Sequence, residues 1–396
     1  MSKVILLSTR YDLGGASLLA TEIAAQLRNR GHDAEAWCLY LHSERHAPPD
    51  PWVRIILHHE PRGVRDLMTM LTGLLSAMRE FRPDAFFGVQ PLANILGAVA
   101  AAAVGCSRRY GGQHNPANSQ RYILRALERF VGTFIYTGNI AVSESVRQTY
   151  LGYPALYRNK MTLIHNGIPE RGRKYSKSEA REHFGLPCDY FLIGTVGQHD
   201  TDQKHHDFLI DLLPRIPDVH LAIAGDGRLR GQLEERIAVL NIADRVHLLG
   251  SVPRKSIEAF LDTLDVFLLP SRFEGFSLSL LEAMQSELPI IGNDIDMIRE
   301  ALCDANEHYG LLIPTGRPDE WSQNILELKN DPRSCVMWSK RAAEGLKRFS
   351  LEKMINAYEQ AAVGDSEADG YHDLLLAPDT SSADHRQLPN ATGSVA

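Results

Sequence analysis

The sequence predicts an α/β protein in which two doubly wound parallel sheets each form the centre of a domain. The chain opens with an apolar strand at residues 3–8, a glycine-rich turn, an amphipathic helix at 18–30 and an apolar strand at 34–40. This order is typical of the start of a doubly wound sheet. In the second half, the segment 266–269 has the uninterrupted hydrophobicity of a strand buried on both faces. With 396 residues, the chain is long enough for two domains.

Composition places the chain among soluble globular proteins, with 44% hydrophobic and 23% charged residues. No apolar run has the length of a transmembrane helix, and the first residues lack the pattern of a signal peptide. The five cysteines are odd in number and lack the spacing of metal ligands. We therefore expect reduced thiols and a cytoplasmic protein.

Charge is spread unevenly along the chain, whose formal net charge is −7. Residues 1–170 have a balance of +5 and the remainder a balance of −12. A basic first half favours an anionic partner, such as a phospholipid surface or a phosphate-bearing acceptor, and we expect no nucleic acid. Ordinary variation of surface charge is the alternative.

The other elements of the first half continue the alternation of strands and helices. We expect strands at 53–57 and 85–89, and helices at 64–81, 92–104 and 119–130. Helix 64–81 is amphipathic and flanked by arginines, so its apolar face packs either on the core or at a membrane interface. Helix 119–130 places Arg121, Arg125 and Arg129 along one side. The polar segment 170–180 is the expected linker.

The second half repeats the pattern. We expect strands at 191–196, 219–224, 246–249, 266–269 and 289–292, and helices at 229–240, 256–263, 318–329 and 333–346. A last helix ends near residue 362. The tail that follows is first acidic and then rich in Ser, Pro, Asp and Asn, so we expect disorder there.

The stretch from Pro270 to Met284 carries the chemistry. Pro270 ends the buried strand, and Ser277 is placed to cap a helix that Leu278 and later apolar residues continue. The free backbone N–H groups at a helix start attract phosphate. Glu274 and Glu282 flank this start, and carboxylates suit such a place if each accepts hydrogen bonds from hydroxyls. A ligand with a sugar, a diphosphate and a ribose in a row is a nucleotide sugar.

This stretch resembles the Glu-x7-Glu signature of the retaining glycosyltransferases of family 4, which have the GT-B fold. The resemblance implies that Glu274 contacts the donor sugar and that Glu282 holds the nucleotide ribose. It implies two Rossmann-like domains that face a central cleft, with a C-terminal helix crossing back to the first domain. The expected bounds are 1–170 for the acceptor-side domain, 171–345 for the nucleotide-sugar domain, 346–363 for the crossover helix and 364–396 for the tail.

Other motifs match the family residue by residue. Lys204 matches a lysine that contacts the diphosphate, whereas Gln198 stands where the family has arginine. Glutamine supplies no charge, so we expect leaving-group stabilisation to depend more on Lys204 and the helix start. His199, His205 and Arg272 are the alternatives for the missing charge.

The first domain also contributes to the implied site. His114 matches a histidine beside the donor sugar, although a lone histidine is more often structural. Gly15 belongs to a glycine loop, 12–17, that faces the donor phosphates or the acceptor. The implied catalytic residues are Glu274, Lys204 and His114, and the implied donor-binding residues are Gly15, Gln198, Val252, Gly275, Phe276, Ser277, Leu278 and Glu282.

The implied reaction is transfer of a sugar, with retention, from a nucleoside diphosphate sugar to a hydroxyl of a glycan, a lipid-linked molecule or a small molecule. UDP is the default nucleotide. We expect no cofactor and no metal, because the pair Asp294 and Asp296 lies in the wrong fold for the metal-binding motif that it spells. The alternatives are other chemistry on this fold, such as nucleotide-sugar epimerisation or phosphorolysis, and a catalytically weak nucleotide-sugar-binding protein. The expected location is the cytoplasm, with peripheral contact at the inner face of the membrane as an option.

Overall fold

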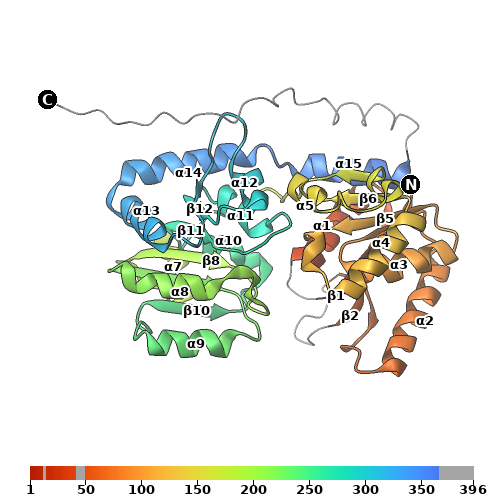
Figure 1. The fold of residues 1–396 in the computed structure, drawn as a ribbon, viewed down its shortest axis with the longest axis horizontal. Coiled ribbons are helices and arrows are strands. Elements are labelled where there is room, and N and C mark those ends of the chain that lie inside the picture. Colours follow the sequence, from red (N-terminus) through yellow and green to blue (C-terminus); the bar gives the residue numbers. More distant parts are fainter. Residues whose placement is uncertain (12–14, 42–49, 365–396) are drawn as a thin grey trace.

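The protein consists of two α/β lobes that lie side by side (Figure 1). The computed structural model describes residues 1–11, 15–41 and 50–364. The residues outside this description are 12–14, 42–49 and 365–396. They include part of the predicted glycine loop and nearly all of the predicted tail. Each lobe is built on one sheet whose paired strands are all parallel, which confirms the predicted fold class.

Both sheets have the strand order of a doubly wound fold, in which the order reverses near the middle. The first sheet contains, in spatial order, β3 (Val53–Leu57), β2 (Asp33–Leu41), β1 (Lys3–Tyr11), β4 (Ala85–Gly88), β5 (Arg108–Gln113), β6 (Gly138–Ala141) and β7 (Met161–Leu163). The second contains β10 (Val246–Gly250), β9 (Val219–Ala224), β8 (Phe191–Val196), β11 (Val266–Leu269), β12 (Ile290–Gly292) and β13 (Leu311–Leu312).

Helices cover the faces of both sheets. The first lobe has α1 (Gly15–Asn29), α2 (Val64–Phe81), α3 (Pro91–Ala103), α4 (Tyr122–Phe134), α5 (Glu144–Thr149) and α6 (Ala155–Arg158). The second has α7 (Lys177–Phe184), α8 (His206–Leu212), α9 (Arg230–Val239), α10 (Ile257–Leu261), α11 (Leu278–Gln285), α12 (Asp296–Leu302), α13 (Pro318–Asn330) and α14 (Pro332–Leu346). The last helix, α15 (Leu351–Val363), lies along the first lobe (Figure 1).

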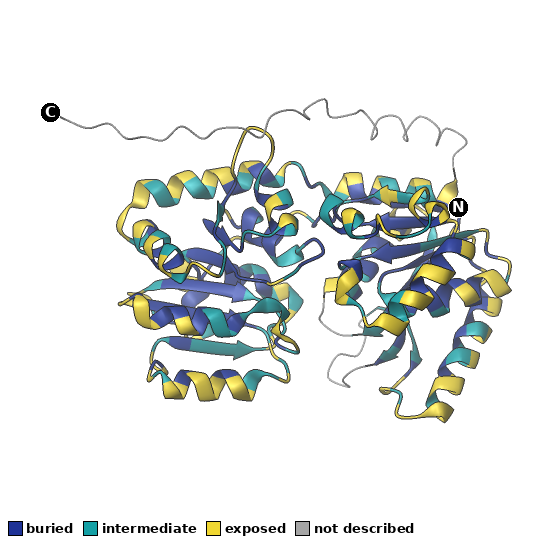
Figure 2. Cartoon of the chain, in the orientation of Figure 1, coloured by how far each residue is buried: buried dark blue, intermediate teal, exposed yellow. Residues whose placement is uncertain are grey.

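The central strands are buried on both faces, as their apolar runs predict. In β11, Val266 and Leu268 belong to one apolar cluster and Phe267 and Leu269 to another, and all four are inaccessible to solvent (Figure 2). The same division holds for β1 in the first lobe. Because successive side chains of a strand point to opposite faces, each strand joins two helical layers to its sheet.

The predicted linker is wrong at its end, because α7 begins at Lys177. Ser176 accepts a hydrogen bond from the Glu179 amide, and the Glu179 side chain accepts one from the Ser176 amide. This capping box satisfies two backbone donors that a helix start otherwise leaves unpaired. On α2, Met70, Leu74, Met78 and other residues are buried, so the face of this helix packs on the core.

Helix α15 crosses back to the first lobe, as the resemblance implied. Its Tyr358 packs edge-on against Phe87 of β4, with the ring centroids 5.3 Å apart. Met354 and Ile355 are buried in the same cluster. At the crossing, a Cβ on Gly167 would lie 2.5 Å from the Leu351 backbone, so only glycine allows this approach. The chain therefore passes between the lobes a second time, and the two crossings lie in contact.

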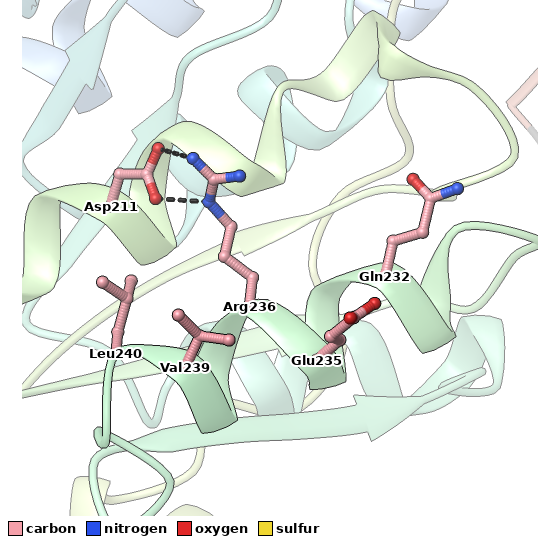
Figure 3. Close-up of a pocket in the computed structure, with 6 residues that line it drawn as sticks. All are labelled: Asp211, Gln232, Glu235, Arg236, Val239 and Leu240. Carbon is pink, nitrogen blue, oxygen red and sulfur yellow. Dashed lines mark hydrogen bonds and ion pairs between the residues drawn. The ribbon is translucent and has the colours of Figure 1, made fainter.

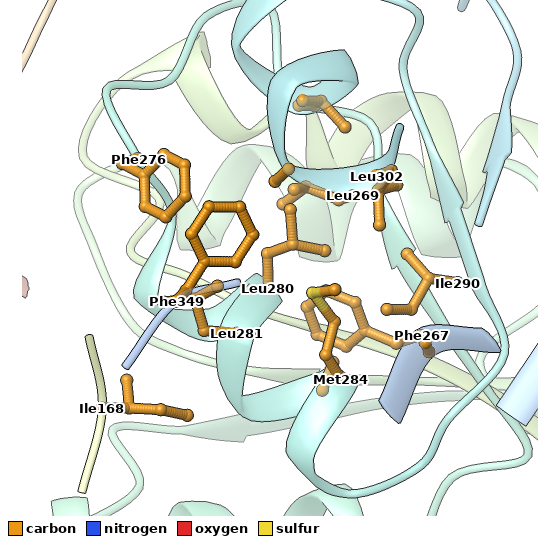
Figure 4. Close-up of a cluster of buried hydrophobic side chains, with 14 of the residues drawn as sticks. Ile168, Phe267, Leu269, Phe276, Leu280, Leu281, Met284, Ile290, Leu302 and Phe349 are labelled. Atoms are coloured by element: carbon orange, nitrogen blue, oxygen red, sulfur yellow. The ribbon is translucent and has the colours of Figure 1, made fainter. Parts of the chain in front are cut away.

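One apolar cluster continues from the second lobe into the crossing (Figure 4). Phe276, at the end of the loop after β11, packs against Phe349 with the ring centroids 4.8 Å apart. The His165 ring lies 5.1 Å from Phe276 and 5.4 Å from Phe349. The Phe276 loop is thus anchored to residues that connect the lobes.

Polar contacts between the lobes fix the same loop. Ser143 Oγ donates to the carbonyl of Gly275 at 3.0 Å, and Asn166 Nδ2 donates to the carbonyl of Phe276 at 2.9 Å. Both donors are buried and belong to the first lobe. A Cβ on Gly275 would lie 1.7 Å from the His114 carbonyl oxygen. Glycine is therefore required at 275 by the close approach of the lobes, rather than by a loose turn as its sequence context suggests.

A second polar contact between the lobes joins α12 to α5. The Glu300 carboxylate accepts hydrogen bonds from the amides of Glu144 and Ser145, at 2.7 and 2.8 Å. His165 Nε2 lies 2.8 Å from the same carboxylate. A negative charge at a helix N-terminus is favourable, so Glu300 of the second lobe caps a helix of the first.

A buried carboxyl group supports the strand end that leads to His114. Glu128 of α4 is buried and accepts hydrogen bonds from Gln113 Nε2 at 2.6 Å and Tyr136 OH at 2.8 Å. The hydroxyl of Tyr157 lies 3.4 Å from the same carboxyl group. Burial raises the pKa of Glu128 from its usual value to about 7. Gln113, the last residue of β5, is therefore held from within the lobe.

We predict that Gly275→Ala lowers the free energy of unfolding by about 1–3 kcal/mol, because the new methyl group must displace the His114 backbone. Chemical denaturation measures the change. Gly316→Ala is the matched control, since no atom lies within 4 Å of a Cβ built at Gly316. Equal stability of the two variants would contradict the packing described here.

We predict that Glu128 makes stability fall as pH rises from about 4.5 to about 7, because in this window the folded state holds a proton that the unfolded state has lost. Between these two pKa values the free energy of unfolding falls by up to about 3 kcal/mol, and the loss is nearly complete at pH 8. Glu128→Gln should remove most of this dependence in denaturation experiments at pH 5 and pH 8. Glu80→Gln, at a side chain that is 74% exposed, should keep it. A pH slope that is unchanged in Glu128→Gln would refute the assignment.

Candidate functional site

A cleft of about 670 Å³ lies between the lobes and is lined by residues of both. It includes all the residues that were predicted to be catalytic or donor-binding: Gly15, His114, Gln198, Lys204, Val252, Glu274, Gly275, Phe276, Ser277, Leu278 and Glu282. These come from the carboxyl ends of strands in both sheets and from the start of α11. Ligands of doubly wound folds bind at this edge. The structure thus brings the residues together, while their individual roles stay predictions.

Glu274 and Lys204 form an ion pair within the cleft. Lys204 Nζ donates to Glu274 Oε1 at 2.7 Å, and the two side chains are 19% and 7% exposed. The stem of Lys204 crosses Gly197, where a Cβ would lie 3.0 Å from Lys204 Cγ. The sequence analysis treated the two residues separately, and the structure shows that each balances the charge of the other.

Glu282 is also paired with a cationic side chain, and this partner was not among the residues predicted from the sequence. Arg254 donates to the Glu282 carboxylate, whose side chain is 7% exposed. Arg254 follows Val252 by two residues, in the turn after β10. A buried carboxylate without a partner is costly, so a cation near Glu282 could have been expected from burial alone. Sequence spacing does not say which cation it is.

The start of α11 faces the cleft between the two glutamates. Ser277, Leu278 and Ser279 line the cleft, and Ser277 occupies the N-cap position with an extended backbone. Its side chain caps no amide and lies 3.1 Å from Ser279 Oγ instead, so the predicted capping bond is absent from this helix. The first amides of an α-helix have no partner within the helix. They therefore remain able to bind an anion.

The start of α1 approaches the same helix, because α1 begins at Gly15, within the segment 12–17 that was predicted to be a loop. A Cβ on Gly15 would lie 3.5 Å from Leu278 Cδ1, an ordinary van der Waals distance. Gly15 is thus across the cleft from the start of α11. The remaining glycine of the predicted pair, Gly14, lies outside the described residues.

Gln198 has an arginine beside it that comes from the other lobe. Arg10 Nη2 donates to Gln198 Oε1 at 3.3 Å and lies 3.6 Å from Asp200 Oδ2. Arg10 is near the end of β1, directly before the glycine loop, and lines the cleft. The sequence analysis did not consider Arg10. Arg10 could have been predicted as a site residue from its position near the carboxyl end of a central strand, where ligands of this fold bind.

The three residues that the sequence analysis offered in place of the missing arginine are outside the cleft lining. Arg272 pairs with Asp202 at 3.7 Å. His199 is buried with its Nδ1 3.2 Å from His206 Nδ1, and burial lowers its pKa. Burial lowers the pKa of His205 as well. Both histidines are therefore mostly neutral at pH 7, and neither supplies a stable charge.

His114 is a neutral imidazole at the floor of the cleft. Burial lowers its pKa to about 4, and its buried Nε2 has no hydrogen-bond partner among the described residues. The ring folds back toward β5, the strand that precedes it, since a Cβ on Gly112 would lie 3.0 Å from this nitrogen. A neutral ring can donate or accept one hydrogen bond but brings no charge.

A second hollow, of about 470 Å³, lies between α8 and α9 on the second lobe (Figure 3). Its central feature is an ion pair in which Arg236 donates to both oxygens of Asp211. It shares no residue with the cleft and contains none of the predicted site residues. The paired side chains are each more than 40% exposed, which is typical of a surface salt bridge.

Residues 1–11, 15–41 and 50–364 contain neither a candidate metal site nor a helix that could span a membrane. Among those residues, no group of three or more His, Cys, Asp or Glu side chains is placed to hold a metal ion. The helices in this part of the chain are all too short or too polar to cross a membrane. Metal independence itself stays a prediction.

Each lobe matches the model of a known protein family. The model of "Glycosyltransferase Family 4" matches residues 13–171, and the model of "Glycosyl transferases group 1" matches residues 176–345. The lipopolysaccharide core biosynthesis mannosyltransferase LpsB of Rhizobium meliloti (strain 1021) is 29% identical over 208 residues, which are 50% of this chain and 58% of LpsB. Alpha-D-kanosaminyltransferase of Streptomyces kanamyceticus is 26% identical over 202 residues, or 50% of each protein.

The chain thus spans about half the length of the curated relatives that it matches. The crystal structure of Anabaena HepE in complex with UDP-glucose superposes with a TM-score of 0.77 at 19% identity. The match covers 92% of this chain and all of HepE, so the two share the GT-B fold. Because the two family models together match residues 13–171 and 176–345, we conclude that the chain belongs to the group 1 glycosyltransferases.

Proposed function

We propose that the protein transfers a glycosyl group, with retention and without a metal ion, from a nucleoside diphosphate sugar to an acceptor hydroxyl. The observation that carries the proposal is the pair of buried carboxylates, Glu274 and Glu282, on either side of an open helix start in a cleft between two lobes. Related proteins are named as sugar transferases, and the HepE structure holds UDP-glucose. A UDP-sugar is therefore the first donor to test.

In the proposed complex, the diphosphate lies between Lys204, the first amides of α11 and the Gly15 loop. Glu274 binds hydroxyls of the sugar, and Glu282 binds the ribose. The turn at Val252 contacts the nucleobase through its backbone. The neutral His114 hydrogen-bonds to the donor sugar from the first lobe.

During the reaction, the bond between the anomeric carbon and the diphosphate oxygen breaks, and a bond to the acceptor oxygen forms on the same face. Negative charge grows on the diphosphate, where the Lys204 ammonium and the helix amides stabilise it. A departing phosphate oxygen takes the proton of the acceptor hydroxyl. Closure of the lobes around the donor limits its hydrolysis.

We propose further that Arg10 supplies the positive charge that Gln198 does not. The guanidinium and the Gln198 amide are in hydrogen-bond contact, so a phosphate that reaches Gln198 also comes within range of Arg10. Arg10 belongs to the first lobe and Lys204 to the second. In this arrangement the leaving group is held by both lobes, and its stabilisation depends on how closely they approach.

We predict that Glu282→Ala mainly weakens donor binding, by about 10- to 100-fold, because a charged hydrogen bond to the ribose is lost. Lys204→Ala and Glu274→Ala should mainly slow transfer, by about 100-fold or more, because they act on the charge that develops in the transition state. Calorimetric donor affinity and turnover separate the two effects. Unchanged turnover in Lys204→Ala and Glu274→Ala would refute the proposed mechanism.

The same measurements distinguish the alternative chemistries. Free UDP that is released only when an acceptor is present supports transfer. A protein that binds the donor but neither transfers its sugar nor slowly hydrolyses it would be a binding protein. An altered sugar that stays attached to UDP would indicate an epimerase.

We predict that Arg10→Gln lowers turnover by about 10- to 100-fold, because one of the cations on the diphosphate is lost. Adding Gln198→Arg to this variant should recover much of the loss, since the charge returns to nearly the same place. Arg65→Gln, at an exposed arginine of the first lobe outside the cleft, is the control. Full activity of Arg10→Gln, or no recovery in the double variant, would refute the role of Arg10.

A further inference from the structure

Helix α4 exposes an unusual row of large apolar side chains, which we call the α4 stripe. The exposed fractions are 75% for Tyr122, 73% for Ile123, 46% for Leu127, 60% for Phe130 and 66% for Phe134. Ile123, Leu127, Phe130 and Phe134 follow the spacing of one helical face. The rings of Phe130 and Phe134 lie 5.1 Å apart. These residues therefore form one continuous apolar ridge on the surface.

The helix that neighbours α4 also exposes an apolar side chain. Helix α6 packs beside α4 and exposes 61% of Leu156. Soluble proteins leave single apolar side chains exposed, but a contiguous row of aromatic residues usually marks an interaction surface. The first lobe exposes other apolar residues at the start of α2, including Val64 and Met68, but none of them is aromatic.

Positive charge accompanies the stripe. Arg121 and Arg129 are exposed and Arg125 is partly exposed, and the Arg125 guanidinium lies 5.8 Å from the centre of the Tyr122 ring. The acidic residue of α4, Glu128, is buried on the opposite side. An apolar ridge with arginines along it fits a partner that is apolar inside and negatively charged at its surface.

We propose that the α4 stripe inserts into the surface of a bilayer that contains anionic phospholipids. The aromatic and aliphatic side chains would enter the boundary of the acyl chains, and the arginines would contact lipid phosphates. A second copy of this chain is a poorer partner, because a symmetric contact between two stripes would bring arginines of both copies together without acidic residues from either helix.

The position of the stripe links it to the cleft. The loop from His114 to Gln120 lines the cleft at its start and leads directly into α4. A bilayer bound at the stripe would therefore lie next to the acceptor side of the cleft. This last step rests on the proposed function, and it favours an acceptor that is itself anchored in the membrane. Binding of the bilayer does not depend on it.

The test is co-sedimentation of the full chain with vesicles of phosphatidylcholine alone and of phosphatidylcholine with 30% phosphatidylglycerol (about the anionic fraction that gives a strong surface potential). We expect binding to the anionic vesicles and weaker binding at high salt. Phe130→Ser with Phe134→Ser should reduce binding at least tenfold. Replacing the three arginines with glutamine should remove the salt-dependent part.

The matched control is Val336→Ser with Met337→Ser on α14, where the side chains are 53% and 41% exposed on the other lobe. This variant should bind vesicles as the unchanged chain does. Failure of the unchanged chain to bind anionic vesicles, or equal binding by the stripe variant, would overturn the proposal. A dimer in analytical ultracentrifugation that the stripe variant abolishes, without vesicle binding, would also overturn it and assign the stripe to a second copy.

Thermal stabilisation by UDP separates this proposal from the proposed function. The stripe variant should be stabilised by UDP as much as the unchanged chain, because the stripe lies outside the cleft lining. Loss of vesicle binding with full UDP binding supports the stripe as the membrane surface. Loss of both would show that the substitutions damage the lobe, and would count against a local role for the stripe.

Discussion

The site depends on two buried hydrogen bonds by which the first lobe holds the backbone of the second. Ser143 and Asn166 donate to the carbonyls of Gly275 and Phe276, so the loop that begins α11 is fixed from across the interface. A buried carbonyl needs a partner, and no side chain of the loop itself provides one here. The position of Glu274, the direction of the helix amides and the distance between the lobes are all set by the same contact. A glycine at 275 is what permits it.

Electrostatics then explains how two carboxylates can stand beside a phosphate site. Each is nearly buried, and each is paired with a cation: Glu274 with Lys204, and Glu282 with Arg254. An unpaired buried carboxylate would repel a diphosphate and destabilise the fold, whereas a paired one adds little net charge. The start of α11 and Arg10 also line the cleft, and Arg10 in turn lies 3.6 Å from Asp200 Oδ2. Lys204, which balances Glu274, is also the residue that we propose binds the leaving group.

The fold and most of the cleft were readable in the sequence because their signals are local. Strands buried on both faces are continuous apolar runs, and the glutamates flank a helix start within one short stretch. The cations were readable only in part. Lys204 follows a recognisable motif, but Arg10 is 188 residues from Gln198, and no periodicity connects the two. Ser277 occupies the N-cap position of α11, as predicted, but its side chain lies against the Ser279 hydroxyl and makes no capping bond. Contacts between the lobes depend on tertiary packing, and the spacing of residues along the chain does not predict them.

The connection between the lobes has a consequence for how the site works. Glu300 caps α5 from the second lobe, α15 returns to the first, and His165 touches both the Glu300 carboxylate and the Phe276 ring. A rotation of one lobe relative to the other must therefore either preserve or break these contacts. Arg10 and Lys204, which come from different lobes, then approach or separate with that rotation. In the proposed mechanism, a donor that binds to both cations would couple stabilisation of the leaving group to closure of the cleft, because it would favour the closed state by its affinity for it.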